Sequence, residues 1–223
     1  MKKLQKRVKR LFYVCFLITG FSLVYLILNY SKISDLVPVH WNIQGVADAF
    51  RHKNFIVVFR NIILEISLVV LFYLIGIQSL GTKILLKGNE NRDLAIKYLR
   101  NISYSTLGMS LSYQILALSI TFSIVNGKDI APIILILSIV LIIFFAFFMS
   151  VYFYKLENIK VNSNEISQYD DEKWLYGLIY YNKEDSEVMV SKRFGVGYTL
   201  NFARIESKVY ILITIVIFMT CFI

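Results

Sequence analysis

The sequence has little charge, only two prolines and only two cysteines. Charged residues make up 17% of its 223 residues, against about a quarter in soluble proteins, and hydrophobic residues make up 57%. Cys15 and Cys221 lie in apolar runs without CxxC or histidine spacing, which argues against a disulfide framework and a zinc site. No nucleophile and base pair and no phosphate loop is found either. The sequence therefore predicts a membrane protein that is not an enzyme and uses no cofactor or metal.

Five apolar runs predict an all-α integral membrane protein with about five transmembrane helices, at 11–30, 62–80, 102–125, 132–154 and 209–223. The first run follows a basic N-terminus and lacks a small-residue cleavage site, so we expect a retained helix and not a signal peptide. The fifth run is short for a bilayer of about 30 Å. The expected units are an N-terminal pair of spans with a loop, two further spans, a polar segment and a terminal span. They occupy residues 1–80 (loop 31–55), 81–154, 155–208 and 209–223.

Basic residues predict the orientation, because Lys and Arg accumulate in cytoplasmic segments. Nineteen of the 24 lie before span one, between spans two and three, or between spans four and five. We therefore expect a multi-pass protein of the bacterial cytoplasmic membrane, with its N-terminus inside and its C-terminus outside. The net charge of +9 arises from this clustering at span ends, so the expected partner is the lipid bilayer and not nucleic acid.

The loop at 31–55, expected on the outer surface, carries the first candidate site. Pro38 favours extended backbone, and residues 42–45 are typical of a turn in which Gly45 takes a positive φ. The candidate recognition residues are Pro38, His40, Trp41, Asn42, Gly45 and Asp48.

Two interpretations of this loop stay open. In one, the polar side chains of His40, Asn42 and Asp48 converge on a ligand. In the other, Trp41 and Phe50 anchor the loop among lipid headgroups, and Asp48 caps the helix that follows.

The pattern P-V-H-[WF]-N-x-x-G-x-x-D-x-aromatic, at 38–50, comes shortly after the first predicted span. It resembles the outer-loop signature of the SdpI-type bacterial membrane proteins, whose best known members are toxin immunity proteins. The resemblance covers spans one and two with the loop between them. It implies a multi-pass protein of the bacterial cytoplasmic membrane that in some members acts both as an immunity factor and as a signal transducer.

The segment 155–208, expected on the cytoplasmic side, carries the second candidate site. Bulky residues at 174–182 and 188–202 suit two strands around a polar turn at 183–187, which predicts a small β-hairpin. A hairpin is too small to be stable alone in water, so we expect it to contact a partner or anionic lipid. The candidate contact residues are Trp174, Tyr180, Tyr181, Asn182, Lys192, Arg193, Phe194, Gly195, Gly197 and Asn201. Their motifs, W-x-x-G-x-x-Y-Y-N and K-R-F-G-x-G-x-T-x-N-F, resemble a small uncharacterised domain found on the cytoplasmic side of bacterial membrane proteins.

Two polar residues stand out inside the predicted spans, Glu65 in the second and Gln114 in the third. Ionisable groups within a membrane are functional candidates by default. Alternatively, Arg60, Asn61 or groups of the outer loop satisfy Glu65 near the membrane surface.

Two functions from different classes follow from these features. In the first, the protein senses or neutralises a membrane-active peptide or toxin through the loop at 31–55, and the segment at 155–208 passes a signal or docks a partner. In the second, it is a non-catalytic accessory subunit that assembles with a membrane transporter or enzyme, or with copies of itself. A membrane hydrolase that uses His40 and Asp48 is the third alternative.

Overall fold

The computed structural model describes residues 2–80, 92–161, 171–192 and 198–222. Most of them form five helices, which confirms the predicted fold class: α1 (Lys2–Leu28), α2 (Phe55–Ser79), α3 (Arg92–Asn126), α4 (Pro132–Val161) and α5 (Ile205–Phe222). Four helices, α1, α2, α3 and α5, start before their predicted apolar runs, because the flanking residues continue the helical backbone. α2, for example, starts where the Asn54 side chain accepts a hydrogen bond from the Val57 amide at 2.9 Å.

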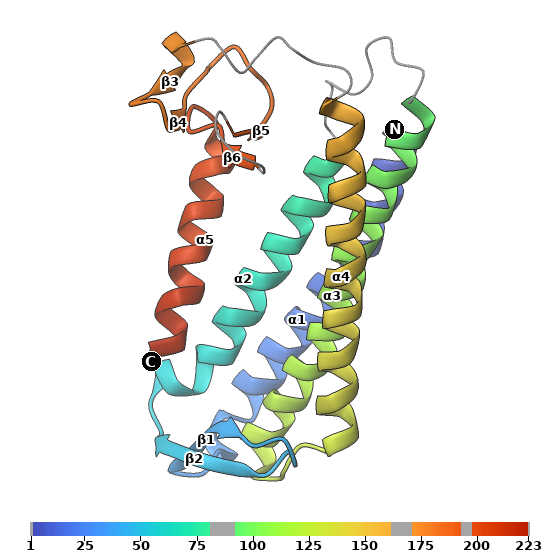
Figure 1. Ribbon diagram of the computed structural model, residues 1–223. Coiled ribbons are helices and arrows are strands. Elements are labelled where there is room, and N and C mark those ends of the chain that lie inside the picture. Colours follow the sequence, from blue (N-terminus) through green and yellow to red (C-terminus); the bar gives the residue numbers. More distant parts are fainter. Residues whose placement is uncertain (1, 81–91, 162–170, 193–197, 223) are drawn as a thin grey trace.

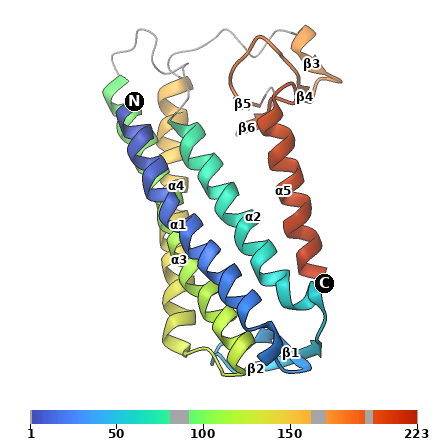
Figure 2. The ribbon, with the colours of Figure 1, turned by 180° about the vertical axis from the view of Figure 1, so that it is seen from behind.

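Helices α1 to α4 form a bundle, and α5 runs along α2 (Figures 1 and 2). The strands β1 (Leu36–Trp41) and β2 (Ala47–His52) lie at one end of the bundle with the α3–α4 connection, which we call the hairpin end. The N-terminus lies at the opposite end, the segment end. Four short strands also lie there: β3 (Trp174–Leu175), β4 (Ile179–Tyr180), β5 (Met189–Ser191) and β6 (Tyr198–Leu200).

Among the described residues, α1, α2, α3 and the Pro132–Leu156 part of α4 are long and apolar enough to cross a membrane. α4 exposes apolar side chains such as Ile143 and Phe147, as expected of a helix that faces lipid. The apolar α5 has 18 residues, and a helix of that length measures about 27 Å. It gains its length by starting at Ile205, ahead of the apolar run.

Two buried apolar clusters hold the bundle together. Toward the segment end, Phe12 of α1 and Val69 of α2 pack with Ile102 of α3. Toward the hairpin end, Leu26 of α1 lies in a cluster that also buries Val37 of β1. The hairpin therefore shares a core with the helices and is not a free loop.

The segment between α4 and α5 forms two short hairpins where one was expected. β3 pairs with β4, and β5 pairs with β6, both antiparallel. Tyr176 and Gly177 have positive φ values of 52° and 71°, so the chain turns inside the stretch 174–182 that was predicted to be one strand. The stretch 183–187 connects the two hairpins, which touch where the Phe202 amide donates to the Tyr180 carbonyl at 2.9 Å.

Candidate functional site

The candidate site at the hairpin end is built on β1 and β2, which pair antiparallel from Leu36 opposite His52 to Trp41 opposite Ala47. The register is irregular on both sides of His40, and such irregularities re-aim side chains. Pro38 and Val37 are buried against the bundle, whereas His40 is exposed. The extended backbone predicted at Pro38 is confirmed.

The turn between the strands is formed by Asn42 and Gly45, as predicted. The Asn42 side-chain oxygen accepts from the amides of Gln44 and Val46, both at 3.0 Å, and the Gly45 amide donates to the Asn42 carbonyl at 2.8 Å. Gly45 has a φ of 77°, a conformation that side chains disfavour. The Asn42 amide oxygen is thus used by the turn and does not reach toward a ligand.

Three contacts fix the hairpin to the helices. The Trp41 indole donates to Ser123 Oγ at 2.9 Å. The Ala47 amide donates to Asp129 Oδ1 at 3.2 Å, and Arg60 Nη2 donates to the Val39 carbonyl at 2.7 Å. Ser123, Asp129 and Arg60 were not predicted as site residues, because their contacts with the hairpin join distant parts of the sequence. The only signal for Asp129 was its place in a polar connection between two apolar runs.

His40 and Asp48 form a pair on the exposed side of the hairpin, with His40 Nδ1 2.5 Å from Asp48 Oδ1. Their side chains are 66% and 43% exposed. His40 and Asp48 thus lie together and Asn42 does not join them, while the binding of a ligand by these side chains stays a prediction. The interpretation of Asp48 as the cap of α2 is wrong, because Asn54 holds that position.

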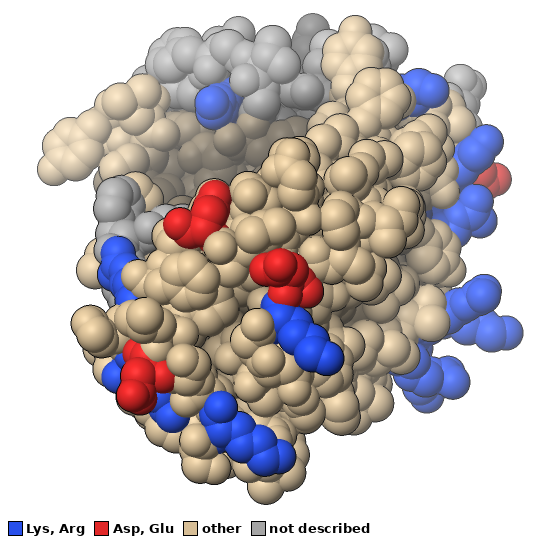
Figure 3. Space-filling model, turned by 90° about the horizontal axis from the view of Figure 1, so that it is seen from below, with Lys and Arg blue, Asp and Glu red and all other residues tan. Residues whose placement is uncertain are grey.

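A pocket of about 430 Å³ lies beside His40, between the hairpin and the helices. His40, Trp41, Arg60, Asn61 and Thr220 contribute its polar groups, and most of its other lining residues are aliphatic, such as Leu116. Acidic and basic side chains are scattered over the face seen from the hairpin end (Figure 3). Because the described residues form no large area of one charge there, the site is suited to an amphipathic ligand more than to a highly charged one.

The predicted contact residues at the segment end are partly used inside the segment. Asn201 is fully buried, and its side-chain nitrogen donates to the carbonyls of Asn182, Asp185 and Glu187 at 2.8 to 3.2 Å. Its side-chain oxygen accepts from the Asn182 amide at 3.0 Å. One asparagine therefore ties the two hairpins together.

Two aromatic residues complete the interior of this segment. Trp174 and Tyr180 are both buried and pack edge to face with ring centroids 5.1 Å apart. The Tyr180 hydroxyl donates to Asp185 Oδ2 at 2.9 Å, and burial raises the pKa of that hydroxyl. Tyr181 and Lys192 are exposed. The other predicted contacts, Arg193, Phe194, Gly195 and Gly197, lie outside the described residues.

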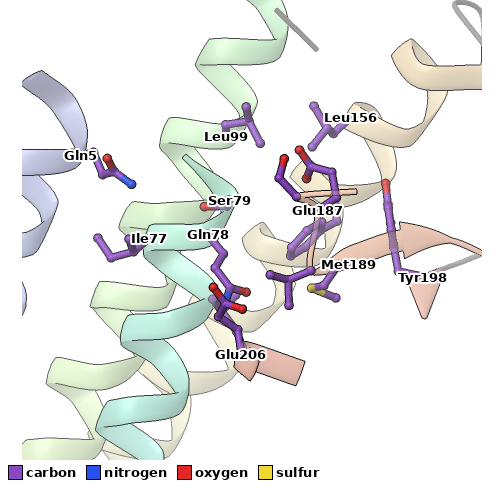
Figure 4. Close-up of a pocket in the computed structure, with 14 residues that line it drawn as sticks. Gln5, Ile77, Gln78, Ser79, Leu99, Leu156, Glu187, Met189, Tyr198 and Glu206 are labelled. Carbon is purple, nitrogen blue, oxygen red and sulfur yellow. The ribbon is translucent and has the colours of Figure 1, made fainter. Parts of the chain in front are cut away.

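A second cavity, of about 220 Å³, lies where this segment meets the bundle. Figure 4 shows its lining, which includes Gln78 of α2, Glu187 of the segment and Glu206 of α5. The Tyr210 hydroxyl donates to Gln78 Oε1 at 2.6 Å, which links α5 to α2. On the segment side, the cavity is lined by residues that include Glu187 and Met189, close to the contacts of Asn201.

Glu65 and Gln114, the polar residues predicted inside the spans, are both fully buried between helices. Arg60 and Asn61 do not satisfy Glu65, since neither of its carboxylate oxygens has a hydrogen-bond partner in the described part of the chain. The interpretation of Glu65 as a residue satisfied near the membrane surface is therefore wrong. No group of three or more His, Cys, Asp or Glu residues that could hold a metal ion occurs among the described residues.

Comparisons with known proteins match two stretches of the chain. Residues 17–64, which include the β1–β2 hairpin, match a domain of unknown function (DUF1648). Residues 183–208, which include β5, β6 and Asn201, match a family of unknown function (DUF5808). No curated protein and no solved structure matches the chain. Both candidate sites thus lie within or overlap stretches that recur as recognisable domains.

Proposed function

We propose that this chain is an SdpI-type membrane protein that recognises a membrane-active peptide or toxin at the hairpin end and thereby protects the cell or reports the agent. The observation that carries this proposal is the exposed His40–Asp48 pair, whose histidine lines a mainly apolar pocket. The hairpin is held by side-chain hydrogen bonds to α2, α3 and the α3–α4 connection. A pre-arranged site loses less conformational entropy when it binds.

An amphipathic peptide fits this arrangement chemically. Its apolar side chains would enter the pocket beside Leu116 and Ile120, and its polar groups would bond the His40–Asp48 pair. Exposed apolar side chains on the hairpin, including Ile43 and Phe50, would keep that site close to the lipid surface, where a membrane-active agent accumulates.

The test is survival of a sensitive bacterial host that produces this protein and is challenged with membrane-active peptides. Wild type is compared with the double variant His40→Gln, Asp48→Asn at equal membrane abundance. Asp35→Asn is the matched control, because it removes one negative charge from the same exposed end without touching the pair. Protection by wild type and Asp35→Asn, lost in the double variant, supports recognition by the pair.

No protection by well-inserted wild type would contradict the proposal. The accessory-subunit function would then be examined by copurification from the native membrane. In that case the exposed Tyr181 and Lys192 are the first residues to change, because Trp174 and Asn201 are needed for the fold of their own segment.

A further inference from the structure

Glu65 lies inside the helix bundle, and its surroundings in the described part of the chain show no basic side chain paired with it. Its side chain is fully buried on α2, and both carboxylate oxygens lack a hydrogen-bond partner of ordinary geometry among the described residues. The membrane-spanning stretches 11–28, 61–79, 101–126, 132–154 and 209–222 contain no Lys or Arg. Arg60, the nearest basic residue along α2, directs its Nη2 to the Val39 carbonyl of the hairpin.

Every side chain known to face Glu65 is neutral or a weak acid. From α1, the hydroxyls of Thr19 and Ser22 lie near the carboxylate but form no hydrogen bond of ordinary geometry with it. From α3, Tyr113 lies close enough to interact electrostatically with the Glu65 carboxylate. Gln114 of α3 donates to Thr19 Oγ1 at 3.1 Å, and its own side-chain oxygen is unpartnered in the described residues.

The titratable groups of the neighbouring helices do not supply a positive charge. Cys15 on α1 and Tyr113 on α3 are weak acids, while α4 and α5 contribute no basic group within their spanning stretches. An ionised carboxylate in such surroundings is costly because neither water nor a cation compensates it. A protonated carboxyl group removes the charge and gains a donor that the surrounding hydroxyl and amide oxygens can accept.

We propose that Glu65 is an intramembrane proton-binding site, whose proton exchanges with water through the pocket at the hairpin end. Asn61 provides the connection, since it lines that pocket and lies one helical turn from Glu65 on the same side of α2. Asn61 Nδ2 donates to the Ala117 carbonyl and to Thr121 Oγ1, both at 3.1 Å. The lining of the pocket therefore includes a polar group one helical turn from the buried acid.

The buried hydroxyls of Ser103 and Thr106, elsewhere in the bundle, differ from this cluster because both have hydrogen-bond partners. Ser103 Oγ donates to the Gly76 carbonyl at 2.7 Å or to the Leu99 carbonyl at 3.0 Å, and Thr106 Oγ1 donates to the Ser103 carbonyl at 2.9 Å. Such contacts are the ordinary means by which helices pack in membranes. The hydroxyls of Ser22 and Tyr113, which face Glu65, instead have no hydrogen-bond partner of ordinary geometry in the described residues. The polar cluster at Glu65 is thus more than packing requires.

Infrared spectroscopy of the full chain in lipid vesicles tests the proposal, because the carbonyl stretch of a protonated carboxyl group is distinct from that of a carboxylate. The band of Glu65 is identified as the carbonyl band that is present in the wild-type spectrum and absent from that of Glu65→Gln. Glu206→Gln is the control, because it should retain this band. It is followed against pH, with and without Na⁺, and after transfer to D₂O. Glu65→Asp, which keeps the carboxyl group, serves if Glu65→Gln does not fold.

At neutral pH we expect the carbonyl band of a protonated Glu65 carboxyl group. This band should shift in D₂O, disappear as the pH rises and not depend on Na⁺. Asn61→Leu should slow the D₂O shift at least tenfold. A Glu65 carboxylate at neutral pH would overturn proton binding. A band of protonated Glu65 that neither shifts in D₂O nor changes with pH would show that the proton does not exchange, and would overturn the proposal. Loss of the band on addition of Na⁺ would also overturn it, because the site would then bind a metal ion. An unchanged rate in Asn61→Leu would overturn the route through the pocket.

Discussion

The carbonyl oxygen of Ile130 occupies the space that a side chain on Gly45 would need. A Cβ added to Gly45 would lie 1.9 Å from that oxygen, and the Ile130 amide donates to the Gly45 carbonyl at 2.9 Å. The turn of the β1–β2 hairpin is therefore in direct backbone contact with the α3–α4 connection. This contact holds the His40–Asp48 pair in a fixed position relative to the bundle.

Replacing Gly45 with Ala should destabilise the protein more than replacing Gly127 with Ala. Both glycines have positive φ, which costs a side chain about 1–2 kcal/mol. A Cβ on Gly127 meets nothing within 4 Å, whereas one on Gly45 meets the Ile130 backbone. Thermal unfolding in detergent measures the difference, and protease cleavage within the hairpin reports its release from the bundle. Equal effects of the two variants would contradict the close packing of Gly45.

Trp41 and Ser123 should be coupled in stability. Trp41→Phe removes the indole donor to Ser123, and Ser123→Ala also removes the hydroxyl that donates to the Lys128 carbonyl. A cycle of both single variants and the double variant isolates their shared hydrogen bond, with an expected coupling of about 1 kcal/mol. Unfolding free energies in mixed micelles provide the measurement. A coupling near zero would show that Trp41 is not anchored to α3.

The sequence predicted the helices and the turn at Gly45 because both depend on local chemistry. Long apolar runs exclude most alternatives to helix in a membrane, and Asn-x-x-Gly with a preceding proline restricts the backbone. The anchoring of Trp41 was beyond reach, since Ser123 lies 82 residues away. The turn at Tyr176 was also missed, because a tyrosine at positive φ breaks the local rule that favours glycine there.

Asn201→Asp should unfold the segment that precedes α5, although asparagine and aspartate side chains have nearly the same shape. The change replaces a nitrogen that donates to three carbonyls with an oxygen that repels them. We expect a loss of several kcal/mol, because the new carboxylate oxygen would be buried against three carbonyl acceptors, while only the other oxygen keeps its amide donors. Limited proteolysis followed by mass spectrometry measures it.

Asn182→Asp is the matched control, since it loses only the contact from its side-chain nitrogen to the Tyr180 hydroxyl at 3.2 Å. Its side-chain oxygen still accepts from the Glu184 amide. Cleavage in the segment should therefore be much faster in Asn201→Asp than in Asn182→Asp. Similar cleavage rates would mean that Asn201 does not tie the hairpins together.

The two ends of the bundle should face opposite sides of the membrane, with the hairpin end outside. The prediction rests on the distribution of Lys and Arg, which favours the cytoplasm for the N-terminus and the segment end. Single cysteines at Ile43 in the hairpin turn and Tyr176 at the segment end test it, because both side chains are exposed. Cys15 and Cys221 are first replaced with Ala. A membrane-impermeant maleimide added to intact cells should label Ile43→Cys at once and Tyr176→Cys only after permeabilisation. The reverse pattern would place the His40–Asp48 pair in the cytoplasm, where it could not meet an agent that arrives from outside.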